Sequence, residues 1–222
     1  MGFDTGKDCA GEAVEKIIIR ENNVLAVETR SGLFVIAQAL KHHTLVFFKL
    51  FTTTPLSFNA DLNHAEYLCC VTPVKSFFKR AKILKLKIPP ASDMEHYSRQ
   101  NHLALDLTDY RLETFIAYAG TKDEIMIPHI PVGGFRLVDW KLQTLQHLSK
   151  EKDIDIINEY QFDTMGVYGE LCERLYLSYR YGRYVEPLKD LRLGNVPKEY
   201  KVYFQIVAGQ ISEEEWKKLP LK

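Results

Sequence analysis

Early in the chain, runs of apolar residues are separated by short polar breaks. Residues 33–40 are apolar on both alternating faces, and residues 45–51 repeat that pattern around a single lysine. Strands that are apolar on both faces lie in the middle of a sheet, because other layers cover each side. We therefore expect neighbouring strands at residues 24–27, 33–40 and 45–51, with Arg30-Ser31-Gly32 as a hairpin turn in which Gly32 takes a positive φ.

Later segments predict strands of a different kind. Residues 67–71 form a short apolar run, and residues 83–88 alternate between apolar residues and lysines, which indicates an antiparallel strand with one exposed face. Residues 114–119 and 124–127 are expected to pair as a further hairpin around Gly120.

Helical spacing replaces this alternation in the C-terminal half. Apolar residues recur on one helical face in two segments, Val138, Leu142 and Leu145, then Tyr168, Cys172, Leu175 and Tyr179. A third helix is expected from Asn195 to Gly209, with Pro197 in its first turn, although an alternation of apolar residues within it also permits a strand. Ser212 and Glu215 have the spacing of a capping box, which predicts a short last helix.

Strands followed by helices indicate an α+β fold. We expect a single domain over residues 1–222, in which a bent, mainly antiparallel sheet occupies residues 20–130 and helices from residues 133–222 pack on it. Closure of the sheet into a barrel-like form stays open at this point. A chain of this length buries enough surface to fold without disulfides, so we expect its four cysteines to be reduced.

Charge and apolar content limit the class of protein. The chain carries 29 basic and 29 acidic residues, and this formal net charge of zero argues against a general binder of nucleic acid or anionic membranes. Its apolar runs are far shorter than the roughly 20 residues of a membrane-spanning helix, and its start lacks the pattern of a signal peptide. We therefore expect a cytoplasmic protein with no membrane partner.

Motifs for catalysis, cofactor binding and metal binding are missing from the sequence, including the P-loop, the dinucleotide fingerprint and the nucleophile elbow. We therefore expect no catalytic residue, no cofactor and no metal. Two pairs, Asp93 with His96 and His102 with Asp106, have a spacing that would place both side chains on one helical face. Such pairs serve in acid–base catalysis, so a small hydrolase-like enzyme is an alternative.

A basic stretch leaves a second alternative open. Residues 75–87 hold six lysines and arginines and no acid. Such a cluster can contact phosphates, and Phe77 and Phe78 could stack on bases, as in a nucleic-acid-associated protein. The simpler interpretation is an exposed edge strand, where lysines block unwanted pairing.

An acidic stretch and a Tyr/Arg stretch contain the candidate partner-binding residues. Between residues 151 and 163, one lysine and five acids give a local charge of 1 − 5 = −4. A negative surface can steer a basic partner, although a solvated helix entrance is the simpler interpretation. Residues 176–184 are rich in Tyr and Arg, which are enriched at binding hot spots. The residues selected are Asp153, Asp155, Glu159, Asp163, Tyr179, Arg180 and Tyr184.

Residues 23–130 resemble the opening of the immunity protein 26 family. The similarity lies in the strand that begins at Asn23, in Leu-Phe-Val-Ile-Ala-Gln-Ala-Leu after the glycine turn, and in Leu-Val-Phe-Phe-Lys-Leu-Phe at 45–51. Tyr-Leu-Cys-Cys-Val-Thr from Tyr67, and a later strand that reaches Pro89, resemble the segments that follow in that family.

The resemblance implies a bacterial protein of polymorphic toxin and contact-dependent growth inhibition systems. Such a protein binds the C-terminal domain of one cognate toxin in the cytoplasm and neutralises it. Inhibition is by occlusion of the toxin's active site or substrate surface, with no turnover by the immunity protein. Many of these toxins are nucleases with basic clefts, so the acidic residues selected above are the expected contact surface.

Overall fold

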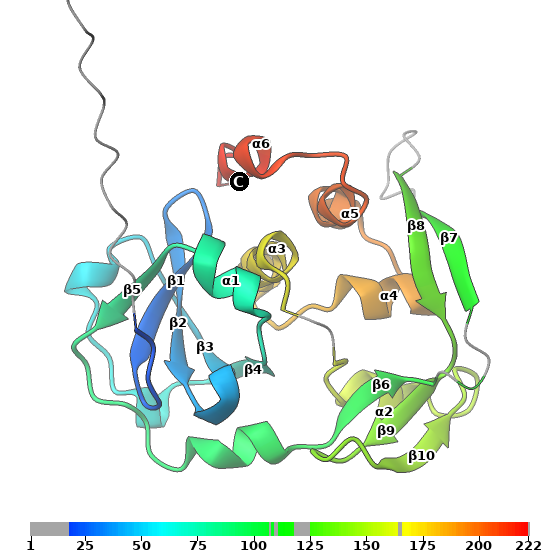
Figure 1. Ribbon diagram of the computed structural model, residues 1–222, viewed down its shortest axis with the longest axis horizontal. Helices are drawn as coiled ribbons and strands as arrows, with labels where there is room; N and C mark the ends of the chain where they lie inside the picture. The colour runs from blue at the N-terminus through cyan, green and yellow to red at the C-terminus, as the bar shows by residue number, and fades with distance from the viewer. Residues whose placement is uncertain (1–17, 107, 109–110, 118–124, 164–165, 222) are drawn as a thin grey trace, which may run out of the picture.

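A five-stranded antiparallel sheet forms the N-terminal part of the computed structural model, which describes residues 18–106, 108, 111–117, 125–163 and 166–221 (Figure 1). The strands are β1 (Val24–Arg30), β2 (Leu33–Ala39), β3 (Leu45–Thr52), β4 (Tyr67–Val71) and β5 (Ile83–Leu86). Their order across the sheet is β4-β3-β2-β1-β5. All five strands predicted for this region are confirmed. The barrel-like alternative is wrong, because β4 and β5 remain at opposite edges of an open sheet.

Both faces of this sheet are covered, as the apolar pattern predicts. Leu25 and Val35 belong to the core on one face, whereas Ala26 and Ile36 belong to the core on the other. The turn between β1 and β2 has a φ of 83° at Gly32, a conformation that glycine adopts without steric cost. The predicted hairpin is therefore confirmed.

Helix α3 (Tyr168–Tyr181) crosses one face of the sheet, with α1 (Lys75–Arg80) and α6 (Glu213–Lys217) packed beside it (Figure 1). Tyr168, Cys172 and Leu175 are buried in that core, so the helix predicted from their spacing is confirmed. Helices from the C-terminal half thus cover the sheet, which establishes the α+β fold.

A buried ion pair joins α3 to the sheet, and a hydrogen bond to the same carboxylate attaches α6. A guanidinium nitrogen of Arg30 lies 2.5 Å from the Glu173 carboxylate, and the indole N–H of Trp216 donates to the same carboxylate at 2.8 Å. Burial raises the pKa of Glu173, and the charge of Arg30 opposes that shift. The Ser212 hydroxyl accepts from the amide of Glu215 at 3.2 Å, which confirms the predicted capping box.

The rest of the chain builds a second, smaller assembly. Strands β6, β9 and β10 form a three-stranded sheet with β9 in the middle, and β7 and β8 form a two-stranded ribbon. The bounds are β6 (His102–Leu105), β7 (Arg111–Ala117), β8 (Ile125–Val132), β9 (Phe135–Val138), β10 (Thr144–Leu148), α2 (Ile154–Glu159), α4 (Pro187–Leu193) and α5 (Lys201–Val207). The ribbon confirms the predicted hairpin, and its connection around Gly120 lies outside the described residues.

The helix predicted from Val138, Leu142 and Leu145 is wrong. Residues 135–148 form the β9–β10 hairpin, in which Leu142 has a φ of 63° and the Asp139 carboxylate accepts from the backbone amides of Lys141 and Gln143. Such a side chain–backbone turn competes with helix formation. Leu142 and Leu145 are more than half exposed, at 57% and 53%, so their helical spacing reflected no buried face.

The third predicted helix is confirmed with a later start. Pro197 is extended, a 3₁₀ turn follows it, and α5 begins at Lys201 rather than at Asn195. Gly209, with a φ of 67°, follows its end, and the alternative of a strand is wrong. Among the described residues, no helix has both the length and the apolar character to span a bilayer.

Candidate functional site

Two adjoining cavities lie between the five-stranded sheet and the smaller assembly. The smaller has a volume of about 280 Å³ and the larger about 860 Å³. Tyr67 of β4, Gln100, Asn101 and Gln161 line both of them, so the two share one wall. We call the pair the cleft. A concave region where two structural units meet is a common place for a binding site.

Gln161 joins the two sheets at this wall. Its side-chain amide donates to the carbonyl of Cys70 at 2.7 Å and accepts from the amide of Cys70 at 3.2 Å, in the way that a neighbouring strand would. Its own carbonyl accepts from the amide of Leu103 at 2.8 Å. One residue therefore satisfies the open edge of β4 and also binds β6. No local sequence pattern marks a lone glutamine for this role.

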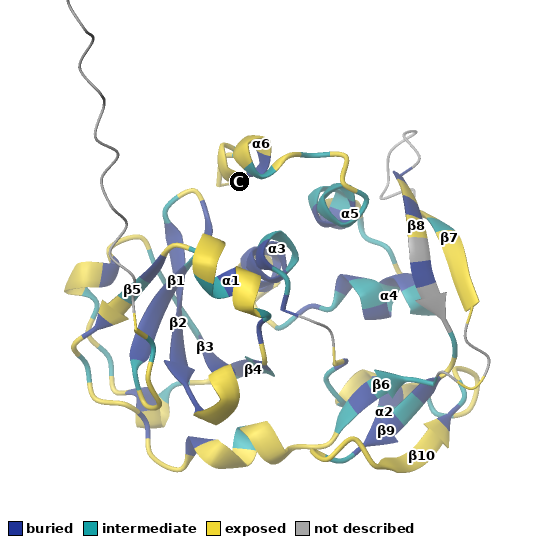
Figure 2. Cartoon of the chain, viewed as in Figure 1, coloured by how far each residue is buried: buried dark blue, intermediate teal, exposed yellow. Residues whose placement is uncertain are grey.

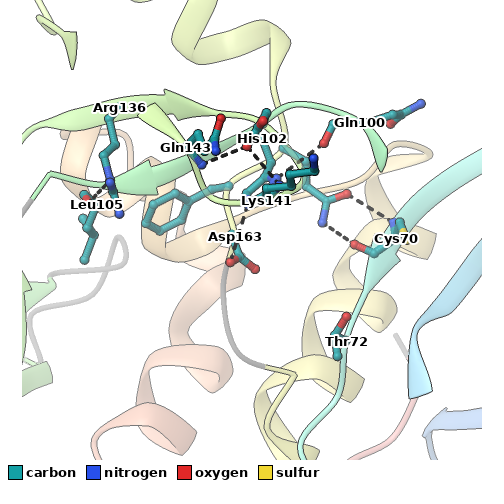
Figure 3. A network of polar contacts seen from close by, with 12 residues as sticks. Cys70, Thr72, Gln100, His102, Leu105, Arg136, Lys141, Gln143 and Asp163 are labelled. Carbon is teal, nitrogen blue, oxygen red and sulfur yellow. Dashed lines mark hydrogen bonds and ion pairs between the residues drawn. The ribbon is translucent and has the colours of Figure 1, made fainter. Parts of the chain in front are cut away.

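His102 lies at the start of β6 and lines the smaller cavity, but the prediction that it pairs with Asp106 is wrong. Its Nε2 is 3.8 Å from a carboxylate oxygen of Asp163, and the two side chains are 22% and 59% exposed (Figure 3). Asp106 instead accepts from Thr108 and contacts the ring of His147. The reason is that residues 102–105 form a strand. In a strand, two side chains that are four positions apart in sequence lie far apart along the sheet, whereas in a helix they would be neighbours.

The electrostatics of Asp106 follow from these contacts. The hydroxyl of Thr108 and then the ring of His147 lower its pKa to about 2, because both stabilise the charged carboxylate.

The other predicted pair also fails to form, since the ring of His96 contacts the backbone carbonyl of Asp93 and not its carboxylate. Within the described residues, no cluster of three His, Cys, Asp or Glu side chains has the arrangement of a metal site.

Cys70 also lines the smaller cavity. Burial raises the pKa of its thiol to about 12, so it is protonated at neutral pH and is a poor nucleophile. Cys69, Cys70 and Cys172 are free thiols, and Cys9 lies outside the described residues.

Aromatic rings form the mouth of the smaller cavity. Tyr67 and Tyr97 are stacked with their centroids 4.2 Å apart, and Trp140, which is 51% exposed, lies on the β9–β10 turn. The Lys141 ammonium is 4.9 Å from the centroid of the Trp140 ring. Exposed aromatic rings beside a polar cavity provide contact area for a bound group.

Two of the charged residues that line the larger cavity, Glu186 and Lys189, neutralise each other. The Lys189 ammonium donates to the Glu186 carboxylate at 2.9 Å and to the carbonyl of Tyr160 at 2.8 Å, and both charged side chains are largely buried. Burial raises the pKa of Glu186, and Lys189 opposes that shift. The Glu186 carboxylate also accepts from the amide of Phe162 at 2.6 Å. The contacts of this ion pair are therefore structural.

Carboxylates stand at the rim of both cavities. Asp155 and Glu159 are exposed and four residues apart on α2, so they share one face of that helix. Glu159 lines the larger cavity and Asp163 the smaller one. Asp153 differs from these, because its carboxylate accepts from the amide of Ser149 at 2.8 Å.

The Tyr/Arg residues selected from the sequence are divided between surfaces. Tyr184 lines the larger cavity with its hydroxyl buried, so it does not project as an anchor. Arg180 lines a separate cavity beside the end of the chain. Tyr179 is exposed and its ring packs against Phe51, with centroids 5.2 Å apart. The structure thus gathers Glu159, Asp163 and Tyr184 around the cleft and leaves Arg180 elsewhere.

The basic stretch is divided between the helix α1 and the edge strand β5. Phe77 is fully buried in the core below the sheet and is not available to stack on a base. Arg80 pairs with Glu213, and Lys82 pairs with Glu28. Lys85 is exposed on β5 at the edge of the sheet, as the simpler interpretation expects, whereas Lys75, Lys79 and Arg80 lie on the helix α1.

Comparison with known proteins identifies a family. The model of a family described as a domain of unknown function, DUF8309, matches residues 14–196. No curated protein and no solved structure matches the chain. The matched range includes the whole cleft and ends before α5 and α6.

Proposed function

Because the chain belongs to the family of domains of unknown function DUF8309, which carries no assigned activity, we propose a function from the cleft and its rim. The protein binds a basic protein partner against α2 and the mouth of the cleft, and it inhibits that partner by occlusion. This is the action of an immunity protein on a toxin domain. The resemblance to the immunity protein 26 family stays a prediction that supports this proposal.

The observation that carries the proposal is a set of carboxylates without counter-ions. Within the part of the chain that the structure describes, no ion pair neutralises Asp155 or Glu159, although both are exposed on one face of α2. Unpaired charges beside a concave surface speed encounter with an oppositely charged partner and fix its orientation.

Occlusion requires a partner that covers or enters the cleft. The larger cavity, of about 860 Å³, has room for one or two long side chains of an inserted loop. Glu159 lines this cavity and Asp163 lines the adjoining smaller one, so each cavity offers a carboxylate to an inserted ammonium or guanidinium. A nuclease toxin uses basic residues to hold phosphates, so contacts with these acids would remove those residues from the substrate.

The test starts from the tagged protein in lysate of its native source. Wild type and the double variant Asp155→Lys/Glu159→Lys are used as parallel baits, and recovered proteins are quantified by mass spectrometry. We expect one basic protein to be recovered in stoichiometric amount with wild type and lost with the double variant. The recovered partner is then purified, and its activity is measured with and without the chain.

The matched control is Glu214→Lys. Glu214 is exposed and lies in the first turn of α6, as Asp155 does in α2, so Glu214→Lys reproduces the loss of an acid from a first helical turn. This variant should recover the partner as wild type does. Equal recovery by the double variant, or a partner whose activity is untouched by the bound chain, contradicts the proposal.

One observation favours a second candidate, an enzyme. The pair of His102 and Asp163 in the smaller cavity has the residue types of an acid–base pair, although 3.8 Å is long for a hydrogen bond. If the protein is an enzyme, wild type should hydrolyse at least one substrate in a panel of esters, amides and glycosides. The variant His102→Gln should be inactive on that substrate. Equal background rates for wild type and His102→Gln remove this candidate.

A further inference from the structure

One edge of the smaller sheet is open. Strand β10 pairs with β9 on one side only, and the order β10-β9-β6 places it at the border of the sheet. Among the described residues, no backbone hydrogen bond joins its other side to a neighbouring segment. The unpaired amides and carbonyls of such an edge are a template for a further strand.

The edges of the five-stranded sheet, and the other edge of the three-stranded sheet, are each protected by an identifiable feature. The amide of Gln161 binds the backbone of Cys70 at the edge of β4. The backbone of residues 161–163 pairs with Leu103 at the edge of β6. The edge of β5 carries the exposed Lys85. Within these two sheets, the edge of β10 is therefore the only one that no described residue protects.

The side chains along this edge are unusually exposed for a strand and its turn. Every residue from Trp140 to His147 is exposed, and Trp140, Leu142 and Leu145 are the large apolar side chains among them (Figure 2). Exposed apolar groups gathered on one hairpin indicate an interaction surface. The residues of β10 itself carry no formal charge apart from a His147 ring that contacts Asp106.

We propose that the edge of β10 binds the β10 strand of a second copy of this chain, antiparallel, about a two-fold axis at Gln146. Gln146 is the middle residue of β10, so each copy presents it to the other at the axis. The two small sheets would then join into one continuous sheet of six strands. This inference does not depend on the proposed function, because the paired strand β10 lines neither cavity and lies outside α2; only Trp140 and Leu142 of the adjoining turn also line the smaller cavity.

Charge complementarity selects a second copy as the occupant. Lys141 lies five positions before Gln146 and Glu151 five positions after it, so antiparallel pairing brings Lys141 of one copy to the end that carries Glu151 of the other. Among the described residues neither side chain has an ion pair; the Glu151 carboxylate accepts from the hydroxyl of Ser149, and the Lys141 ammonium lies over the Trp140 ring. A two-fold axis repeats that attraction twice, and no like charges face each other within the paired strands.

A cysteine cross-link tests the pairing. In Gln146→Cys the two thiols face each other across the axis, at the roughly 4.5–5.5 Å between Cβ atoms of directly opposed residues, which is close to what a disulfide needs. We expect mild oxidation to give a covalent dimer on a non-reducing gel. Thr144→Cys is the matched control, because its two copies would lie roughly 13 Å apart along the strands and should stay unlinked. Wild type reports the background from its own cysteines.

Sedimentation of charge variants provides the second measurement. Lys141→Glu and Glu151→Lys each turn two attractive contacts into repulsive ones, so each should weaken the dimer on the order of tenfold. The double variant Lys141→Glu/Glu151→Lys exchanges the charges and should restore wild-type affinity. A wild type that stays monomeric up to about 100 µM, or a dimer that neither links through Gln146→Cys nor responds to the exchange, overturns the inference.

Discussion

Removal of the Gln161 amide should destabilise the protein measurably. In Gln161→Ala the backbone N–H and C=O of Cys70 lose the partners that they have at 3.2 and 2.7 Å. Each unsatisfied, partly buried group costs about 1 kcal/mol or more, so we expect the free energy of unfolding to fall by about 2 kcal/mol. For a chain of this length, that loss lowers the Tm by about 4–8 °C.

Urea denaturation followed by circular dichroism gives this difference directly, provided that the slope with urea is unchanged. Gln161→Met keeps the side-chain bulk without the polar atoms and should lose about as much as Gln161→Ala. Gln210 is exposed, so Gln210→Ala serves as the control and should stay within about 0.5 kcal/mol of wild type. A second readout is the thiol of Cys70, which should react faster with a disulfide reagent once the edge of β4 loosens.

Two results would refute this reasoning. If Gln161→Ala unfolds within about 0.5 kcal/mol of wild type, the amide does not hold the edge of β4. If Gln161→Met is as stable as wild type while Gln161→Ala is not, packing rather than hydrogen bonding explains the loss. Either result would also remove Gln161 as the link between the two sheets at the cleft.

Three further predictions concern other parts of the fold. Trp216→Ala should lower the free energy of unfolding by about 3–5 kcal/mol, because it empties a buried site, whereas the exposed Trp140→Ala should change it by less than about 0.5 kcal/mol in the same urea titration. The pKa of Asp106 in the folded protein, about 2, lies below its ordinary value of 3.8, so its contribution to stability is present above pH 3.8 and is lost as the pH falls toward 2. A carbon-detected NMR titration should show the lowered pKa. Asp106→Asn should flatten the pH dependence of the free energy of unfolding between pH 3.8 and 2. Gly133→Ala would place a Cβ against the carbonyl oxygen of Asp106 and should lower the Tm, and a Tm equal to that of wild type would show that this close approach relaxes without cost.

Much of the larger sheet could be predicted because its strands carry a strong local signal. Residues 33–40 are apolar on both faces, and β2 is buried throughout. The spacing of Tyr168, Cys172 and Leu175 marks the buried face of α3 in the same way. Such patterns arise because one face, or both, must leave water.

The smaller sheet and the cleft could not be predicted for physical reasons. Strand β10 has four exposed residues out of five, so burial imposed no alternation on its sequence. The amide of Gln161 binds a residue 91 positions earlier, and this contact exists only after both sheets have formed. His102 could be selected as a candidate, but its partner Asp163 becomes visible only in three dimensions.

The central claim is that the exposed carboxylates of α2 hold a basic partner. Calorimetric titration of the purified partner tests it most directly, with wild type, Asp155→Lys/Glu159→Lys and Glu214→Lys measured at low and at physiological salt. We predict that the double variant loses at least about tenfold in affinity, that wild-type binding weakens as salt rises, and that Glu214→Lys binds as wild type does. Equal affinity of wild type and the double variant, with no dependence on salt, would contradict the account.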